Sequence, residues 1–326
     1  MTLLQVQDLR VRFHGRHVAV DGVDFGIAAG ETVAVVGESG SGKSVTALSI
    51  LRLFGAADAA ETSGRILWRD AQGGVQDLLA LPEPRMRDLR GRDIAIIFQD
   101  PGANLNPVFS IGRQIAEVLQ RHRGLARAAA MQQAEALLRQ VGISDAARRL
   151  HAFPHQLSGG MRQRVMIAIA LACSPRLLIA DEPTTALDVT IQAQILHLLR
   201  QLQASTGSGL IFITHDLELV SDIADRVVVM YAGQVVETGP VQQVLAQPRH
   251  PYTAALLACR PHRGADGAVH FAPIPGAPPR GGSFPAGCRF AARCTLATPA
   301  CTGGPVALQE VSAGRAARCL HTDRLA

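Results

Sequence analysis

Lysine occurs once in this chain, at Lys43, although 32 of the 326 residues are lysine or arginine. Lys43 lies in the pattern G-x-x-x-x-G-K-[ST], in which glycines let consecutive backbone N–H groups point at phosphate oxygens. A compact ammonium reaches between two phosphates, where a planar guanidinium is too wide. The segment therefore predicts a nucleoside triphosphate site and not a plain glycine-serine turn. We expect the ligand to be held by Gly37, Glu38, Ser39, Gly40, Ser41, Gly42, Lys43, Ser44 and Val45.

The segments on both sides of this loop fit a phosphate site. Residues 31–36 read as a buried apolar strand, and residues 45–54 as an apolar helix. A strand, a glycine-rich loop and a helix in this order place the positive N-terminus of the helix against the bound anion. The hydroxyl of Ser44 is then the expected ligand of a Mg²⁺ ion.

Two carboxylates follow a second apolar strand. Residues 177–180 are apolar, and Asp181 and Glu182 come directly after them. Such acids also occur as plain helix caps. Next to a phosphate loop, we expect Asp181 to hold Mg²⁺ through water, and Glu182 to orient and deprotonate the water that attacks the phosphate.

A second candidate anion site begins at Ser158. Together with Gly159 and Gly160 it precedes an apolar helix, so its backbone N–H groups would be free to bind an anion. Two phosphate sites in one chain predict two halves of a composite site.

At this point the sequence resembles the ATP-binding cassette (ABC) family, over residues 1 to about 240. In that family the signature motif of one subunit, here Ser158, Gly159 and Gly160, closes over the γ-phosphate of ATP bound to the other subunit. The resemblance implies that Gln99 reaches Mg²⁺ and the attacking water, and that His215 contacts the γ-phosphate. These two residues and Glu182 are the expected catalytic residues, and Ser44, Gln99 and Asp181 are the expected Mg²⁺ ligands.

The resemblance also assigns residues along the subunit interface and around adenine. Asp188 matches the D-loop, which runs along the dimer seam, and Phe13 takes the place of the tyrosine that stacks on adenine. The sequence departs from the commonest pattern here and at Met161, where glutamine is usual. Phe13 is equally explained as a strand residue packed in the core, and Met161 points to a subfamily.

The fold class predicted by this pattern is α/β, because apolar strands alternate with helical segments, as in a mostly parallel sheet covered on both faces. Helical spacing predicts helices over residues 127–141 and 189–203 and after Gly160. Strands are expected at 3–7, 11–13, 31–36, 64–69, 94–98, 177–180, 210–213 and 227–230.

The family resemblance adds a domain organisation. It implies a P-loop NTPase (RecA-like) core, an antiparallel β subdomain and a helical signature subdomain at about residues 100–165. Together these make an ABC ATPase domain over residues 1–240. A Pro- and Gly-rich texture begins past Gly239, so residues 241–326 are expected to form a small irregular extension that contains four cysteines.

Two further stretches resemble the ATPases of oligopeptide, dipeptide and nickel importers. They are residues 99–115, beginning Gln-Asp-Pro-Gly-Ala-Asn-Leu-Asn-Pro, and residues 249–257, with the sequence His-Pro-Tyr-Thr at 250–253. The resemblance implies an ATPase that energises import of peptides, or of a related solute such as nickel. It also implies as partners a second ABC ATPase subunit, itself or a paralogue, two integral permease subunits and an external solute-binding protein. A soluble ABC ATPase in DNA repair or translation is the alternative, and a redox sensor built on the cysteines is a third hypothesis.

The four cysteines of the extension, Cys288, Cys294, Cys301 and Cys319, have the spacing C-x5-C-x6-C-x17-C. Disulfides are disfavoured in the reducing compartment where ATP is found, so a Cys₄ metal centre is preferred. The spacing is wider than the usual C-x₂₋₄-C of structural zinc. The segment resembles the cysteine motif of peptide-importer ATPases, some of which hold a [4Fe–4S] cluster. We expect iron–sulfur, with zinc or unligated thiols as alternatives.

Composition and charge limit the remaining function classes. The net charge of +5 divides into +6 for residues 240–326 and −1 for the residues before them. The arginine bias favours a solvated basic surface over a site for nucleic acid or for anionic lipid headgroups. The longest apolar run, residues 165–173, is half of the ~18 residues that suggest a membrane span. The N-terminus has no signal-peptide pattern. We expect a peripheral protein on the cytoplasmic face of the cell membrane, with no nucleic-acid partner.

Overall fold

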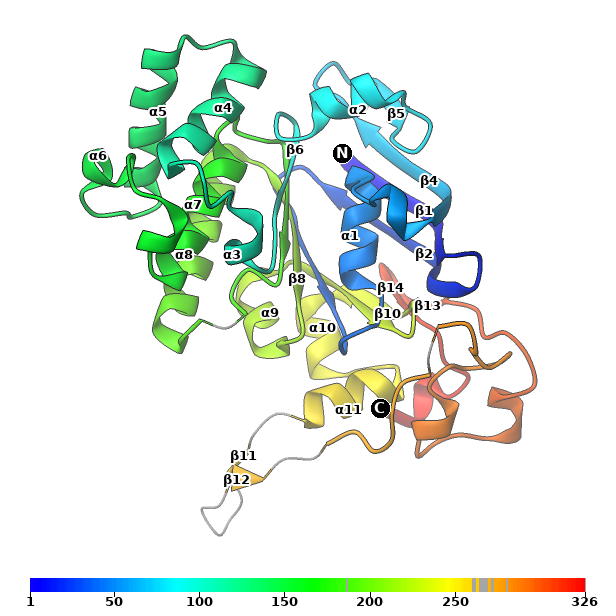
Figure 1. Ribbon diagram of the computed structural model, residues 1–326. Helices are drawn as coiled ribbons and strands as arrows, with labels where there is room; N and C mark the ends of the chain where they lie inside the picture. The colour runs from blue at the N-terminus through cyan, green and yellow to red at the C-terminus, as the bar shows by residue number, and fades with distance from the viewer. Residues whose placement is uncertain (186, 260–261, 264–268, 271–272, 280, 326) are drawn as a thin grey trace. The chain divides into compact units, whose positions relative to one another are not determined.

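The computed structural model describes residues 1–185, 187–259, 262–263, 269–270, 273–279 and 281–325, and Figure 1 shows its helices and strands. The chain divides into two compact units. Unit 1 comprises Met1–Leu3, Ile27–Glu31 and Ala80–Ile213. Unit 2 comprises Leu4–Gly26, Thr32–Leu79 and Thr214–Ala326.

Unit 1 is built on three parallel strands and the helices packed around them. The strands are adjacent in the order β8–β7–β6, and β7 pairs with both of its neighbours in parallel. All residues of β7 and β8 are buried, which is the pattern of a sheet covered on both faces. The elements are α2 (Glu83–Leu89), β6 (Ile94–Ile97), α3 (Pro101–Asn104), α4 (Ile111–Arg123), α5 (Arg127–Gln140), α6 (Ala146–Arg149), α7 (Gly159–Leu171), β7 (Leu177–Asp181), α8 (Val189–Thr206) and β8 (Gly209–Thr214).

The long helices of unit 1 begin and end where the sequence supplies caps. Ser110 and Asp188 accept backbone N–H hydrogen bonds at the starts of α4 and α8. Gly124 and Gly207 end these two helices in the left-handed conformation, with φ of 64° and 65°. The helix expected over residues 127–141 is confirmed as α5. In Figure 1, α4, α5 and α7 stand together, and this packing forms the helical part of the unit.

Unit 2 contains an antiparallel sheet with the strand order β2–β1–β4–β5. Its strands are β1 (Thr2–Phe13), which begins in unit 1, β2 (His17–Ala28), β4 (Ala60–Arg69) and β5 (Val75–Asp77). The two short strands expected at 3–7 and 11–13 are one strand with an irregular register between Gln7 and Arg10. Asp8 causes the break, because its φ is 44° and its N–H donates to the side-chain oxygen Oδ1 of Asp24 at 2.9 Å instead of to a backbone carbonyl.

A second run of strands in unit 2 has the order β13–β14–β10–β9–β3. β3 and β9 pair in parallel, and the remaining pairs are antiparallel. The strands are β3 (Thr32–Val36), β9 (Arg226–Tyr231), β10 (Gln234–Pro240), β13 (Gln309–Ser312) and β14 (Arg315–Ala317). The other elements of the unit are α1 (Lys43–Leu51), α9 (Leu217–Ile223), α10 (Val241–Ala246), α11 (Pro251–Ala258) and the short pair β11 (His262–Arg263) and β12 (Val269–His270).

The C-terminal extension shares the core of unit 2. Tyr252 and Phe290 are buried in one cluster with Tyr231 and with apolar residues of β3 and β9. The ring centroids of Tyr231 and Tyr252 lie 4.6 Å apart, and Phe290 meets both rings edge-on at 5.3 and 5.4 Å. Aromatic packing therefore joins the extension to the strands that carry the phosphate loop.

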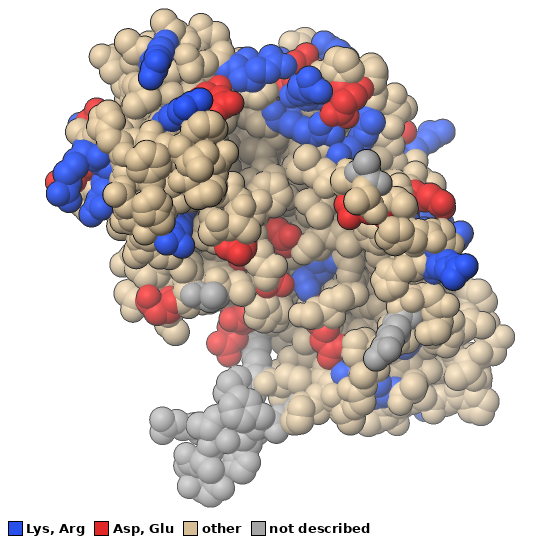
Figure 2. Space-filling view, in the orientation of Figure 1, with Lys and Arg blue, Asp and Glu red and all other residues tan. Residues whose placement is uncertain are grey.

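The basic tail does not form the solvated surface expected from its charge. Arg289, Arg293 and Arg315 form ion pairs, with at most 8% of each side chain exposed. Arg318 donates to the carbonyl oxygens of Val235 and Val306. Figure 2 accordingly shows few blue atoms over the extension on the viewed face. The expectation of a solvated basic surface is wrong for these arginines, because they bind carboxylates and carbonyl oxygens within unit 2.

Candidate functional site

The phosphate loop connects β3 to α1, and two of its glycines have no room for a side chain. Gly37 has a φ of 151°, and a Cβ atom there would overlap the carbonyl oxygen of Met230. Gly42 has a φ of 99°, and a Cβ atom would lie 2.7 Å from the carbonyl oxygen of Ala19. Both positions therefore need glycine for the backbone to curl tightly and present its N–H groups.

Lys43 holds the loop in this curled shape. It is the first residue of α1 and only 5% exposed. Its ammonium donates to the carbonyl oxygens of Gly37 at 2.7 Å and of Glu38 at 3.0 Å. Among the described residues, Ser41 Oγ is buried in the same loop without a hydrogen-bond partner. A buried hydroxyl of this kind suits a phosphate oxygen as acceptor, so the loop fits the nucleotide predicted from its sequence.

The carboxylates of unit 1 lie at the end of β7, as expected. Asp181 is the last residue of the strand and is 6% exposed. Glu182 follows in the left-handed region with a φ of 45°, which is unusual for a residue with a long side chain. Its Oε2 accepts hydrogen bonds from Gln99 Nε2 at 3.1 Å and from Thr185 Oγ1 at 2.9 Å. Glu182 and Gln99 are thus brought together, although 83 residues separate them.

Ser158, Gly159 and Gly160 lie at the N-terminus of the thirteen-residue helix α7. Ser158 is the N-cap, and its Oγ accepts the N–H of Met161 at 3.4 Å. A Cβ atom on Gly160 would lie 3.0 Å from a methyl group of Ile191, a residue of α8. The start of α7 is therefore closely packed and presents backbone N–H groups, as the signature motif requires.

The remaining predicted residues occupy three different settings. Asp188 caps α8 by accepting the N–H of Ile191 at 2.9 Å, whereas residue 186 of the same segment lies outside the described residues. His215 is exposed and directly follows β8. Phe13 is half-buried in unit 2 and meets Phe54 edge-on, with ring centroids 5.5 Å apart. The adenine-stacking role of Phe13 stays a prediction.

The predicted nucleotide residues are distributed over both units. Unit 1 contains Gln99, Ser158, Gly159, Gly160, Asp181, Glu182 and Asp188, and unit 2 contains Phe13, residues 37–45 and His215. Sequence reasoning missed two residues that contact the phosphate loop within unit 2. Tyr252 Oη accepts the N–H of Glu38, and Arg293 forms an ion pair with its carboxylate.

The four cysteines of the extension gather around one small pocket. They are free thiols, and the pocket is lined by Cys288, Cys294, Cys301 and Cys319. Burial raises the pKa of Cys288, Cys294 and Cys319, and the neighbouring thiols add to the effect for each of them. Within the described residues, no group of three or more His, Cys, Asp or Glu side chains is positioned to hold a metal ion.

The other two cysteines lie outside this group. Cys173 follows α7, and Cys259 is the C-cap of α11; both are half-buried. Neither is a fully buried core residue, because each lies past the last buried turn of its helix.

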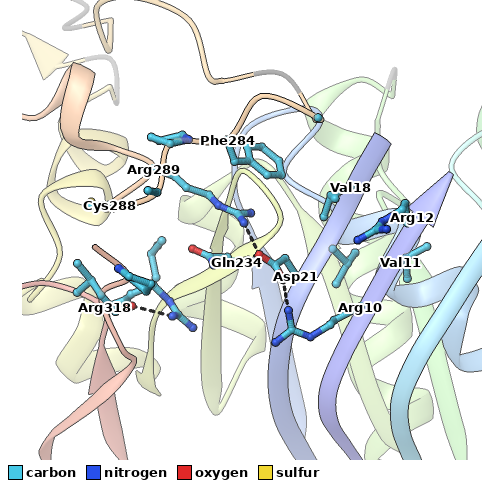
Figure 3. A pocket seen from close by; sticks show the side chains of 18 of the residues that line it. Arg10, Val11, Arg12, Val18, Asp21, Gln234, Phe284, Cys288, Arg289 and Arg318 are labelled. Atoms are coloured by element: carbon cyan, nitrogen blue, oxygen red, sulfur yellow. Dashed lines mark hydrogen bonds and ion pairs between the residues drawn. The ribbon is translucent and has the colours of Figure 1, made fainter. Parts of the chain in front are cut away.

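A larger cavity in unit 2, of about 760 Å³, is lined by several arginines and is separate from residues 37–45. Figure 3 shows Arg10 and Arg289 pointing at Asp21 from two sides. Arg289 forms an ion pair with Asp21, and its guanidinium lies 3.8 Å from the centroid of the Phe284 ring. Burial lowers the pKa of both Arg289 and Arg318. Asp21 thus joins the extension to the antiparallel sheet.

Comparison with known proteins identifies the class to which this geometry belongs. The family model for ABC transporters matches residues 20–185. An ATP-binding cassette solved as a dimer in a post-hydrolysis state, bound to ADP and Pi, is 26% identical and superposes with a TM-score of 0.63, covering 73% of this chain and 99% of that one. CbiO1 of Clostridium perfringens, part of an ABC transporter complex, is 28% identical with a TM-score of 0.61, covering 75% of this chain and 91% of that one. The chain belongs to the ABC transporter family and has the P-loop NTPase fold expected from its sequence.

The C-terminal region narrows the comparison to one group within the ABC transporter family. The model for the C-terminal region of oligopeptide/dipeptide transporters matches residues 236–301. A putative peptide import ATP-binding protein of Brucella melitensis is 49% identical over 332 residues, which cover 99% of this chain and 98% of the relative. A probable peptide ABC transporter ATP-binding protein of Sinorhizobium fredii is 48% identical over 326 residues, covering 99% and 96%.

Membership of this family makes the protein an ATPase, which works as a dimer with membrane permease partners. It is a peripheral subunit of a membrane transporter. None of the helices in the described part of the chain is long and apolar enough to cross a membrane. The alternative of a soluble cassette in DNA repair or translation is not supported by the relatives found.

Proposed function

We propose that this chain is the ATP-hydrolysing subunit that energises import of peptides, dipeptides or oligopeptides, or of a related solute such as nickel. The observation that carries the proposal is the C-terminal region, because it matches the oligopeptide/dipeptide transporter model and contacts the phosphate loop within unit 2. Relatives named as a peptide import ATP-binding protein and as a peptide ABC transporter ATP-binding protein match over nearly the whole chain and support the same assignment.

In this proposal each predicted residue of the nucleotide site has a role in ATP hydrolysis. Residues 37–45 bind the phosphates, and Phe13 stacks on adenine. Ser44, Gln99 and Asp181 hold Mg²⁺, which neutralises charge on the phosphates when it is bound. Glu182 takes a proton from the attacking water, and Gln99 orients that water. His215 contacts the γ-phosphate.

Glu182 is well supported as the general base. Its strained backbone fixes the direction of the side chain, and the hydrogen bonds from Gln99 and Thr185 fix the position of the carboxylate. Both donors bind the same oxygen, Oε2. A carboxylate held in this way is oriented before the water arrives, which is the condition for efficient proton transfer.

The composite site requires a second subunit, either a copy of this chain or a related ABC ATPase. Ser158, Gly159 and Gly160 of one subunit bind the γ-phosphate held by the other, and Asp188 lies along the seam between them. We further propose two integral permease subunits, an external solute-binding protein acting on the permease, and a location on the cytoplasmic face of the cell membrane. The ATPase domain then ends near residue 240 and the extension covers residues 241–326.

For the four cysteines we propose a [4Fe–4S] cluster, with zinc as the alternative. Four thiols around one pocket are a donor set that suits iron–sulfur or zinc. A single zinc ion requires every pair of sulfurs within about 4.6 Å, twice the Zn–S distance. Among the described residues, no three of these thiols are close enough together to hold one metal ion. When bound, the cluster stabilises thiolates that burial alone disfavours.

Purification from membranes tests the proposed function. After solubilisation in mild detergent, the tagged chain should bring down two integral membrane proteins and a second ABC ATPase. Reconstituted into vesicles with its binding protein and ATP, the complex should accumulate labelled peptide, and a complex with Glu182→Gln should not. Recovery of ribosomes or nuclease-resistant DNA instead of membrane proteins would favour the soluble alternative.

A further inference from the structure

Glu38, the second residue of the phosphate loop, is held by two side chains of the C-terminal extension. Its backbone N–H donates to Tyr252 Oη at 2.8 Å. Its carboxylate accepts two hydrogen bonds from Arg293, from Nη1 at 2.8 Å and from Nη2 at 3.0 Å. These contacts lie within unit 2 and join residues 214 and 255 positions apart in the sequence. The paired Arg–carboxylate geometry is strong and directional.

Arg293 is fixed independently of Glu38. Its side chain is only 5% exposed, and it also donates to the carbonyl oxygens of Ile274 at 3.2 Å and Pro275 at 2.9 Å and to Tyr231 Oη at 3.2 Å. A guanidinium with this many partners has little freedom to move. The Arg293 guanidinium therefore determines the position of the Glu38 carboxylate, and Glu38 does not determine the position of Arg293.

Tyr252 is fixed as well. It is fully buried, and its ring packs against Tyr231 and Phe290. Its own N–H donates to His250 Nδ1 at 3.0 Å, which caps α11. Burial raises the pKa of Tyr252, so the phenol stays neutral. Its oxygen accepts the Glu38 N–H.

Glu38 also presents an electrostatic difficulty for a loop that binds phosphates. A free carboxylate there would repel the anionic ligand, because like charges a few ångströms apart disfavour each other. The Arg293 guanidinium cancels this charge. Meanwhile the carbonyl oxygen of Glu38 accepts from Lys43 Nζ. The N–H, the carboxylate and the carbonyl oxygen of this one residue thus have separate partners.

We propose that Arg293 and Tyr252 are positioning residues that hold the phosphate loop ready for nucleotide, so that ATP affinity depends on the C-terminal extension. The inference rests on the proposed role of residues 37–45 as the nucleotide site. The extension thereby becomes part of the ATPase machinery and not an appendage to it. A preformed loop binds more tightly, because less conformational freedom is lost when the ligand arrives.

The test measures the Kd of a fluorescent ATP analogue on the purified full-length chain. Arg293→Lys keeps the charge but loses the two-pronged contact, and we expect the Kd to rise roughly tenfold, the effect of losing a hydrogen bond between charged groups. Tyr252→Phe removes only the acceptor for the Glu38 N–H and should raise the Kd roughly fivefold. The matched control is Arg289→Lys, in the same extension but paired with Asp21, and it should leave the Kd unchanged.

A double-variant experiment separates positioning from a general loss of structure. Arg293→Met should raise the Kd in the parent chain but change it less than about twofold when Glu38→Gln is already present, because contacting residues are coupled. An equal effect in both backgrounds would overturn the proposal. Where Arg293→Met does not fold, as judged by circular dichroism, Arg293→Lys and Tyr252→Phe decide the question, and an unchanged Kd in both overturns it.

The variant Lys43→Ala separates the test of the positioning residues from the test of residues 37–45 as the nucleotide site. If Lys43→Ala leaves binding intact, the proposed role of residues 37–45 fails. If Lys43→Ala abolishes binding while Arg293→Lys and Tyr252→Phe bind normally, only the positioning proposal fails. Steady-state kinetics give a further readout: the KM for ATP should rise in both positioning variants, with a smaller change in kcat.

Discussion

The side-chain amide of Gln99 donates a 3.1 Å hydrogen bond to the Oε2 atom of Glu182. Thr185 Oγ1 donates to the same oxygen. Gln99 comes from the segment after β6, and Glu182 from the end of the neighbouring parallel strand β7. Parallel strands present their carboxyl ends at one edge, where ligands of α/β sheets bind. The pairing of β6 and β7 therefore places the amide beside the carboxylate before any ligand is bound.

We expect Glu182→Gln to bind ATP normally but to hydrolyse it about 10²- to 10⁴-fold more slowly, since the amide keeps the shape of the side chain and loses the base. Phosphate release under saturating ATP is the measurement. Glu117→Gln, at an exposed position of α4 in the same unit, is the control and should keep the parental rate. Hydrolysis at the parental rate in Glu182→Gln would show that another group is the base.

Lys43→Arg should lose most of its affinity for ATP even though the charge is kept. Lys43 is 5% exposed and its ammonium fits between the carbonyl oxygens of Gly37 and Glu38. A planar guanidinium does not fit the same place. Titration with a fluorescent ATP analogue measures the loss, and circular dichroism checks that the variant is folded. Unchanged affinity would mean that the loop does not bind the phosphates.

Protein purified without oxygen should be brown and contain iron and acid-labile sulfide near four per chain, as expected for a [4Fe–4S] cluster. Replacing Cys288, Cys294, Cys301 or Cys319 by serine should remove the colour. Cys173→Ala and Cys259→Ala are the controls and should keep it, because neither residue lines the pocket. Zinc without iron would favour the alternative metal, and a folded chain with no metal would refute both.

The stability of the fold should fall in mild acid because of His250. Burial, and then the positive charge of Arg318, lower the pKa of His250 to about 3. In the unfolded chain the pKa of His250 is near 6.5. Below that pH the unfolded chain therefore binds a proton at His250, whereas the folded chain does not, and protonation favours the unfolded chain. The stabilisation is complete above pH 6.5 and is lost progressively as the pH falls from 6.5 towards 3. The nearby carboxylate of Glu237 accepts the backbone N–H of His250.

Urea unfolding at pH 7.5 and pH 5.0 measures this loss. The free energy of unfolding should fall by about 2 kcal/mol more in the parent chain than in His250→Asn, which lacks the titrating group but keeps an acceptor for the Tyr252 N–H. His151→Asn, at an exposed position, is the matched control and should follow the parent. If His250→Asn shows the same pH dependence as the parent, the buried neutral imidazole does not contribute to it.

Local patterns were sufficient to predict the central strands and the phosphate loop. β3, β7, β8 and β9 are short apolar runs bounded by polar residues, and such runs need no knowledge of the rest of the chain. The strand β2 was missed, although it has twelve residues, because polar and glycine residues interrupt its apolar positions. The glycines of the phosphate loop were expected to let the backbone turn its N–H groups toward a ligand. The positive φ angles of Gly37 and Gly42 agree with this expectation.

Contacts between distant residues could not be predicted in this way. Nothing near Glu38 in the sequence indicates that Arg293 neutralises it, because the two residues are 255 positions apart. Glu237 is likewise fully buried and pairs with Arg315, 78 residues away. The sequence showed the extension as a string of prolines, glycines and cysteines. Arg289, Arg293 and Phe290, which join the extension to the rest of unit 2, belong to no local pattern that indicates these contacts.

The pairing of β10 with β14 limits how this protein can be shortened. Glu237 and Thr238 of β10 pair with Ala317 and Ala316 near the end of the chain. A chain cut after residue 240 would expose the β10 edge, whose unpaired backbone groups are a template for intermolecular aggregation. It would also leave the Glu237 carboxylate without Arg315 and without the backbone N–H groups of Arg249 and His250. A soluble minimal ATPase must therefore retain its last strands, or replace Glu237 and protect the exposed edge.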